Sequence, residues 1–101
     1  MAPTVRDNPD RFRFEILIDG SVVGFSEYRI VQDRVVFTHT ETEDGHEGEG
    51  LASLLVKSAL DDVRARGRKI VPLCPFVASY IERHGEYADL IDQALASELD
   101  H

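Results

Sequence analysis

Two glycines separated by one residue, Gly48 and Gly50, stand where the hydrophobic pattern of this chain changes its period. Before them apolar and polar residues alternate, as in strands, and after them apolar residues recur every three to four positions, as in an amphipathic helix. Glycine lets the backbone turn sharply and approach a ligand closely. The first N–H groups of such a helix lack partners and carry a positive dipole, so they suit a phosphate group. A tight strand-to-helix turn without any ligand explains the same pattern.

Three strands are expected before the glycines. The first begins near Arg11, and Asp19-Gly20 then gives a strong hairpin signal. Further strands are expected over residues 21–30 and 35–42, which are rich in β-branched and aromatic residues. Alternation places the apolar residues of the first strand on one face, namely Phe12, Phe14, Ile16 and Ile18. These segments predict an antiparallel three-strand meander.

The pattern after the glycines predicts helices around one further strand. An apolar stripe at helical spacing runs over residues 51–66, and Gly67 ends that helix. A short apolar strand follows over residues 69–74, then helices over 76–84 and 86–99. The element order β-β-β-α-β-α-α predicts an α+β layered sandwich.

Composition limits the classes of function. The 101 residues suffice for one domain, which we expect over residues 11–99, after a flexible N-terminus over residues 1–10. No run approaches the roughly 18 apolar residues of a membrane span, and no apolar signal core precedes the domain. The single cysteine, Cys74, agrees with a reducing compartment. We therefore expect a cytoplasmic protein that does not bind a membrane.

The charge of the chain also limits its partners. Nineteen acidic residues against 11 basic ones give a net charge of −8. This balance opposes nucleic-acid binding, which needs Lys and Arg on one face. It permits a cationic partner, such as an amine or a basic protein segment, although surface acidity commonly serves solubility alone.

Four short stretches carry a resemblance to a known family. They are Phe37-Thr38-His39-Thr40-Glu41, Gly48-Glu49-Gly50-Leu51-Ala52, Pro72-Leu73-Cys74-Pro75-Phe76-Val77 and Tyr80-Ile81-Glu82-Arg83-His84. In this order they resemble the core of the GNAT N-acetyltransferases, which use acyl-coenzyme A, and especially the minimal YjdJ-type branch. The resemblance covers about residues 11–92. It implies a GNAT-like layered sandwich in a short form without the flanking elements of full-size enzymes.

The resemblance implies a site for acetyl-coenzyme A. The coenzyme's diphosphate would lie on backbone N–H groups of the glycine turn, and its pantetheine arm between residues 38–42 and 71–74. Tyr80 lies one residue from the position of the general-acid tyrosine of full-size members. The implied cofactor-binding residues are Thr38, His39, Thr40, Glu41, Gly48, Glu49, Gly50, Leu51, Ala52, Cys74 and Tyr80.

This sequence departs from the family pattern at the glycine turn. Gly45 occupies the position where relatives carry Gln or Arg, and Glu47 and Glu49 place carboxylates beside an anion site. Like charges weaken diphosphate binding unless these side chains point into water.

Cys74 is a candidate catalytic residue, because a thiol at a helix N-terminus is readily activated. Two functional roles are open: an acyl-enzyme nucleophile, or part of the wall of the thioester pocket. A small buried core residue is the third possibility.

His39 and Glu41 are the candidate general bases, because attack on a thioester requires a free amine. They lie two residues apart on a strand and hence on one face, which Phe37 is expected to share. Histidine titrates near neutral pH, whereas a carboxylate needs burial to act there. A structural histidine is the alternative. No set of residues has metal-ligand spacing.

These observations lead to an acetyl-coenzyme A-dependent N-acyltransferase that acts on an amine of unknown identity. The alternative is a non-catalytic module that binds coenzyme A or acyl-coenzyme A, or a protein-interaction domain. The expected partners are acyl-coenzyme A and an amine acceptor, and the expected state is a monomer or a weak homodimer.

Overall fold

The computed structural model describes residues 2–43 and 50–99, and the statements below concern these residues. The strands are β1 (Thr4–Asn8), β2 (Arg13–Ile18), β3 (Ser21–Val31), β4 (Arg34–Thr42) and β5 (Ile70–Pro72). The α-helices are α1 (Leu51–Ala65), α2 (Pro75–Arg83) and α3 (Gln93–Leu99), and two 3₁₀ helices are η1 (Pro9–Arg11) and η3 (Gly85–Leu90). None of the described helices is long and apolar enough to cross a membrane.

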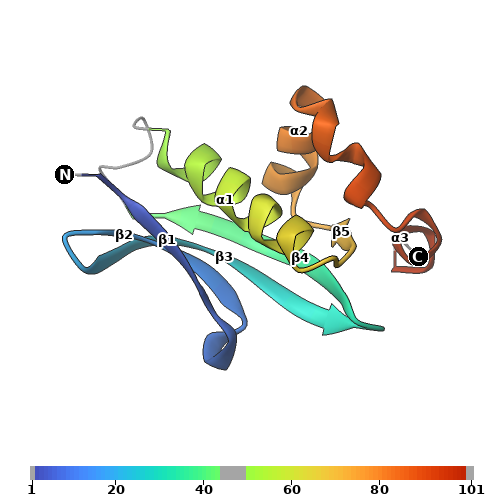
Figure 1. Cartoon of the computed structure of the whole chain (residues 1–101), viewed down its shortest axis with the longest axis horizontal. Helices are drawn as coiled ribbons and strands as arrows, with labels where there is room; N and C mark the ends of the chain where they lie inside the picture. Colours follow the sequence, from blue (N-terminus) through green and yellow to red (C-terminus); the bar gives the residue numbers. More distant parts are fainter. Residues whose placement is uncertain (1, 44–49, 100–101) are drawn as a thin grey trace.

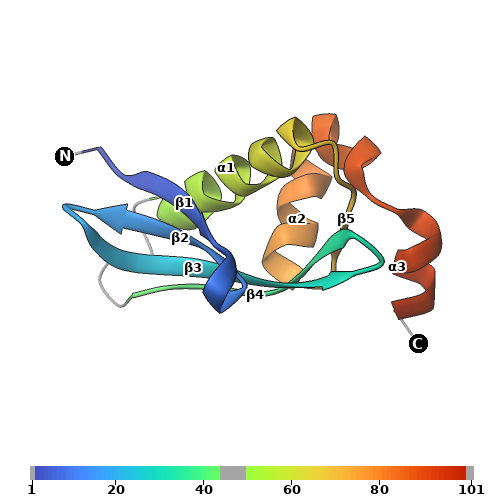
Figure 2. The same ribbon diagram turned by 60° about the horizontal axis from the view of Figure 1, so that its bottom comes forward.

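The five strands form one sheet in the order β1-β2-β3-β4-β5. The first four pair antiparallel, and β5 pairs parallel with β4. Helices α1 and α2 lie on one face of the sheet, here called the helix face, and α3 lies near β5 at the end of the molecule (Figures 1 and 2). This arrangement confirms the α+β layered fold predicted from the sequence.

The main core lies between the helix face and α1 with α2. The apolar stripe of α1 is buried, as its spacing predicts, through Leu51, Leu55, Val56, Ala59, Leu60 and Val63. Gly67, with φ 70°, ends α1: its N–H donates to the Arg64 carbonyl, and the Arg68 N–H donates to the Val63 carbonyl.

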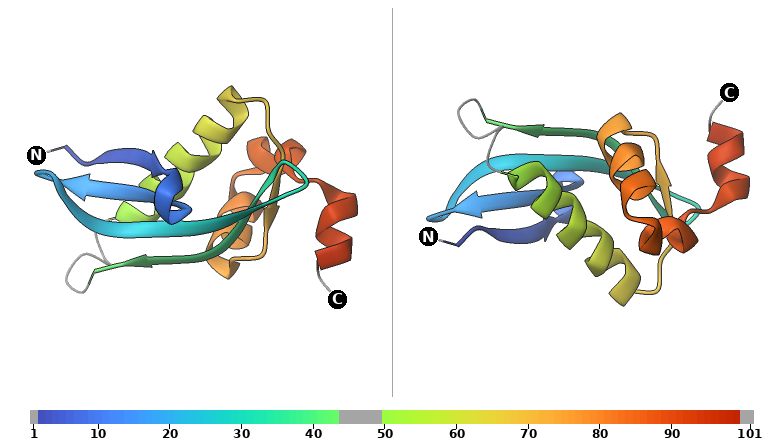
Figure 3. Two further views of the ribbon diagram at one scale, coloured as in Figure 1. Left: turned by 90° about the horizontal axis from the view of Figure 1, so that it is seen from below. Right: turned by 90° about the horizontal axis from the view of Figure 1, so that it is seen from above.

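A second, smaller cluster forms on the opposite face. Val36 and Val71 point away from the main core, because neighbouring residues of a strand face opposite sides, and they pack with Leu95 of α3. Most of this opposite face, over β2 to β4, lies away from α1 and α2 (Figure 3). We call it the open face.

The sequence predicted a flexible N-terminus over residues 1–10, and this prediction was wrong for residues 4–8, which form β1. This strand pairs along β2, from Thr4 opposite Leu17 to Asn8 opposite Arg13. Its charged residues hide the strand pattern, yet charge is common on edge strands, where it discourages pairing with other chains.

The prediction of a single helix over residues 86–99 is also wrong, because the helical conformation is interrupted at Ile91. There it forms a bridge with Ile70, and the Asp92 N–H donates to the Ile70 carbonyl. The Asp92 carboxylate then accepts from the Leu95 N–H at 3.0 Å, which starts α3. Phe12 differs too: it occupies the turn before β2 with φ 52°, 55% exposed, instead of facing the core.

A buried carboxylate organises the open face. Glu15 on β2 is 1% exposed and accepts from Arg6 at 2.9 Å, Arg13 at 2.8 Å and Asn8 at 3.2 Å. Burial alone would raise the pKa of this carboxyl, but the hydrogen bonds from Arg13, Arg6 and Asn8 outweigh burial and lower it. The ionised carboxylate therefore stabilises the fold.

We expect Glu15→Gln to lower the free energy of unfolding at about pH 7 by about 1–3 kcal/mol, because two arginines lose their anion. The folded-state pKa of Glu15 lies below its unfolded value of about 4.3, so its contribution is complete above that pH and disappears as the pH falls through the folded-state value. Urea unfolding measures the free energy of unfolding at about pH 7 and about pH 3. Between these two pH values this free energy should fall more in the parent than in Glu15→Gln. Glu98→Gln, an exposed change on α3, should follow the parent. Equal losses in the parent and Glu15→Gln would contradict this role.

Candidate functional site

Strands β4 and β5 separate early. They pair only from Val35 opposite Ile70 to Phe37 opposite Pro72, and the Cys74 N–H then donates to the Phe37 carbonyl at 2.8 Å. Beyond this point β4 continues to Thr42 with no partner from β5 in the described residues (Figure 3). Backbone groups on this edge of β4 are therefore available to a ligand, as on any unpaired strand edge.

A bulge in β4 lies at the point of separation. Glu27 pairs with His39, but Tyr28 pairs with Phe37, so Thr38 is an extra residue in β4. The extra residue reverses the alternation of side chains. Phe37 consequently lies in the main core, whereas His39 lies on the open face. The expectation that Phe37 shares a face with His39 was wrong, because the sequence pattern does not reveal the bulge.

The helix face holds a short chain of hydroxyl and thiol groups beside the separation. The hydroxyls of Ser26 and Thr40 lie 2.9 Å apart, and the Thr40 hydroxyl lies 3.3 Å from the Cys74 sulfur. Ser26 is fully buried, and Cys74 is 2% exposed. Cys74 directly precedes Pro75, the first residue of α2. The thiol therefore lies next to the unpaired edge of β4, on its helix side.

The candidate bases lie on the open face. The Nε2 atom of His39 and a carboxylate oxygen of Glu41 are 2.6 Å apart, so these residues share a face, as expected. Both side chains are more than half exposed, at 54% and 56%. The thiol of Cys74 thus lies on one side of the sheet, and the His39–Glu41 pair of β4 lies on the other.

The start of α1 has the features of an anion site. Gly50 precedes the helix with φ 72°, a conformation that favours glycine. The Leu54 N–H is bonded to the Gly50 carbonyl, so helix geometry leaves the N–H groups of Leu51, Ala52 and Ser53 without acceptors in the helix. No acidic side chain occupies the first turn of α1. The other implied residues of the turn, Gly48 and Glu49, lie outside the described residues, as do Gly45 and Glu47.

Tyr80 lies in the main core on α2. Its ring stacks on His84 with centroids 4.0 Å apart, and it also contacts Tyr87 at 6.1 Å. Burial raises the pKa of the Tyr80 hydroxyl, so the phenol keeps its proton over a wide pH range. Its assignment to the cofactor site stays a prediction.

Sequence reasoning did not find Ser26. A serine at an inward position of β3, two residues before the buried Tyr28, was the available signal, but its partner Thr40 depends on strand register. Within the described residues, no three His, Cys, Asp or Glu side chains are arranged to hold a metal ion.

Comparisons with known proteins find a matching family model and two solved structures with a similar fold. The family model for GCN5-related N-acetyl-transferases matches residues 13–90. The solution structure of a GCN5-like protein from Staphylococcus aureus superposes with a TM-score of 0.66 at 22% identity, covering 87% of this chain and 86% of that one.

A second solved structure matches a smaller share of this chain. The ribosomal-protein-alanine N-acetyltransferase from Brucella melitensis biovar Abortus 2308 gives a TM-score of 0.54 at 23% identity, covering 62% of this chain and 49% of that one. A search of curated protein sequences finds no match. At these identities, the two structures support the fold alone.

Proposed function

Because the chain belongs to the GCN5-related N-acetyltransferase family, we propose that it transfers an acetyl group from acetyl-coenzyme A to an amine. One observation carries the proposal: β4 and β5 separate after Phe37, and the separation lies beside Cys74 and Thr40. A thioester placed there has an unpaired strand edge on one side and a buried thiol on the other.

The residues at the start of α1 and along β4 fit the coenzyme. The N–H groups of Leu51, Ala52 and Ser53 would hold the diphosphate, because they are unpaired donors at the positive end of a helix dipole. The edge of β4 over residues 38–42 would bond the amides of the pantetheine arm. The coenzyme supplies the activated acyl group as a thioester.

His39 and Glu41 would prepare the amine. Their exposure on the open face lets an amine reach them, and their 2.6 Å contact orients the imidazole. The amine nitrogen attacks the thioester carbonyl, the new C–N bond forms, and the C–S bond breaks. His39 accepts the proton of the amine, and a proton returns to the sulfur of the departing coenzyme. A β4 N–H group near residues 39–40 would stabilise the oxyanion.

Cys74 fits the pocket wall better than the nucleophile. Its sulfur is buried, and β4 separates it from the His39–Glu41 pair that would receive the amine. An acyl-enzyme route remains the second candidate, because the Thr40 hydroxyl contacts the sulfur at 3.3 Å. The two routes differ in whether an acetyl group ever resides on Cys74.

We expect Gly50→Trp to raise the Kd for coenzyme A at least about tenfold, because the loss of one hydrogen bond to a charged group has about this effect. Gly67→Trp is the matched control, because both glycines have φ near 70° and a Cβ at either meets no described atom within 4 Å. Each change strains the backbone by about 1–2 kcal/mol, but only Gly50 borders the proposed diphosphate site. Calorimetric titration measures both affinities. Equal affinities in the two variants would contradict this assignment.

We expect His39→Ala to lower kcat about 100-fold or more, because a general base contributes roughly that factor. Cys74→Ala should keep most of the activity, because alanine fills nearly the same space without a thiol. The assay follows thiol release from acetyl-coenzyme A with a panel of primary aliphatic amines, and intact mass of the protein reports acetylation. An acetyl adduct on the parent that Cys74→Ala removes, together with its activity, would establish the acyl-enzyme route instead. Coenzyme binding without turnover by the parent would indicate a non-catalytic binding module.

A further inference from the structure

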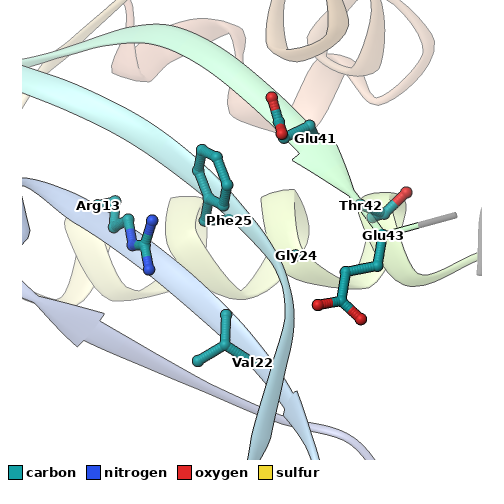
Figure 4. Close-up of a pocket in the computed structure, with 7 residues that line it drawn as sticks. All are labelled: Arg13, Val22, Gly24, Phe25, Glu41, Thr42 and Glu43. Atoms are coloured by element: carbon teal, nitrogen blue, oxygen red, sulfur yellow. The ribbon is translucent and has the colours of Figure 1, made fainter.

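A hollow of about 260 Å³ lies on the open face of the sheet (Figure 4). Strands β2 and β3 contribute Arg13, Val22 and Phe25 to its lining, and β4 with the residue after it contributes Glu41 and Glu43. Its volume lies just below the roughly 300–1,000 Å³ of typical ligand pockets. An occupant of this hollow is therefore a small molecule or a single side chain.

The lining favours a cation. Among the described residues, Arg13 is the only basic side chain in the lining, and it already bonds the buried carboxylate of Glu15 at 2.8 Å and lies over the Phe25 ring at 4.5 Å. Glu15 also accepts from Arg6, so it offsets the charge of Arg13 only in part. Glu41 and Glu43 then give the lining a negative charge, while Val22 and Phe25 provide apolar walls for an aliphatic chain.

The hollow adjoins the proposed base through Glu41 and Phe25. Glu41 belongs both to the lining and to the 2.6 Å contact with His39, whose ring lies 6.3 Å from that of Phe25. The Glu43 N–H donates to the Val23 carbonyl at 2.8 Å, so the strand pairing continues to this residue. His39, Glu41 and Glu43 therefore follow one another at two-residue steps, roughly 6.8 Å each in an extended strand.

We propose that this hollow binds the acceptor and selects an aliphatic amine that carries a second ammonium group, such as a short diamine or polyamine. One nitrogen lies at the His39–Glu41 pair, and the other nitrogen lies at Glu43. The step of two residues is close to the separation of the nitrogens in an extended four-carbon diamine. The term acceptor rests on the proposed acetyl transfer, whereas the binding of a dication by the hollow does not.

The test compares two probes that differ only in the second charge, 1,4-diaminobutane and n-butylamine. Calorimetric titration of the full chain without coenzyme should give a Kd for the diamine about tenfold lower than for butylamine, the effect of one hydrogen bond between charged groups. Glu43→Gln should remove this preference. Glu98→Gln changes the net charge equally at an exposed position on α3 and should preserve it. The preference should also shrink as salt is added.

Three results with the two amine probes would overturn the proposal. They are equal affinities for the two probes in the parent, no measurable binding of either probe, and a diamine preference that survives in Glu43→Gln. A lysine-containing tetrapeptide that binds better than the diamine would assign the hollow to a protein side chain and overturn the choice of a small polyamine. If coenzyme A binds the same sample while neither amine does, the acetyl-transfer proposal stands and only the acceptor pocket fails.

Discussion

The structure depends on the short pairing between β4 and β5. Three residue pairs and the bond from the Cys74 N–H to the Phe37 carbonyl join the two strands, and beyond them β4 has an open edge. Packing supplements this limited pairing and holds β5 and α2 against the sheet: Val71 packs in the smaller cluster, and Val77 packs in the main core. The pairing also brings a buried thiol beside the unpaired edge of β4. Continuous pairing would close this site.

The bulge at Thr38 determines which side chains of β4 lie on each face of the sheet. Before it, Phe37 fills the main core, and after it Thr40 contacts Cys74 on the helix face while His39 and Glu41 meet on the open face. A thioester and an amine can therefore approach the same strand edge from opposite sides. The ionic network around Glu15 stabilises the open face. It also holds the guanidinium of Arg13 in place, and Arg13 lines the hollow beside the His39–Glu41 pair.

Much of the fold was predictable because it follows local rules. The apolar stripe of α1, the helix end at Gly67 and the turn at Asp19-Gly20 each depend on nearby residues. β1 escaped prediction because a charged edge strand lacks the apolar alternation of a central one. The bulge was not predicted, because a shift of strand register does not change the residue pattern of the sequence. The bulge nevertheless decides which face His39 occupies. For the site, Cys74 was predicted from its place before Pro75, whereas the contacts of Thr40 with Cys74 and with Ser26 depend on the pairing of distant strands.

The most direct test is an amide ¹H–¹⁵N spectrum of the protein recorded during titration with coenzyme A. The account predicts saturable shifts concentrated at Leu51, Ala52 and Ser53, along residues 38–42 of β4, and at Cys74. These amides mark the start of α1 and both sides of the strand separation. Shifts confined to other elements, or a spectrum unchanged at saturating coenzyme, would contradict the assignment of this separation as the coenzyme site.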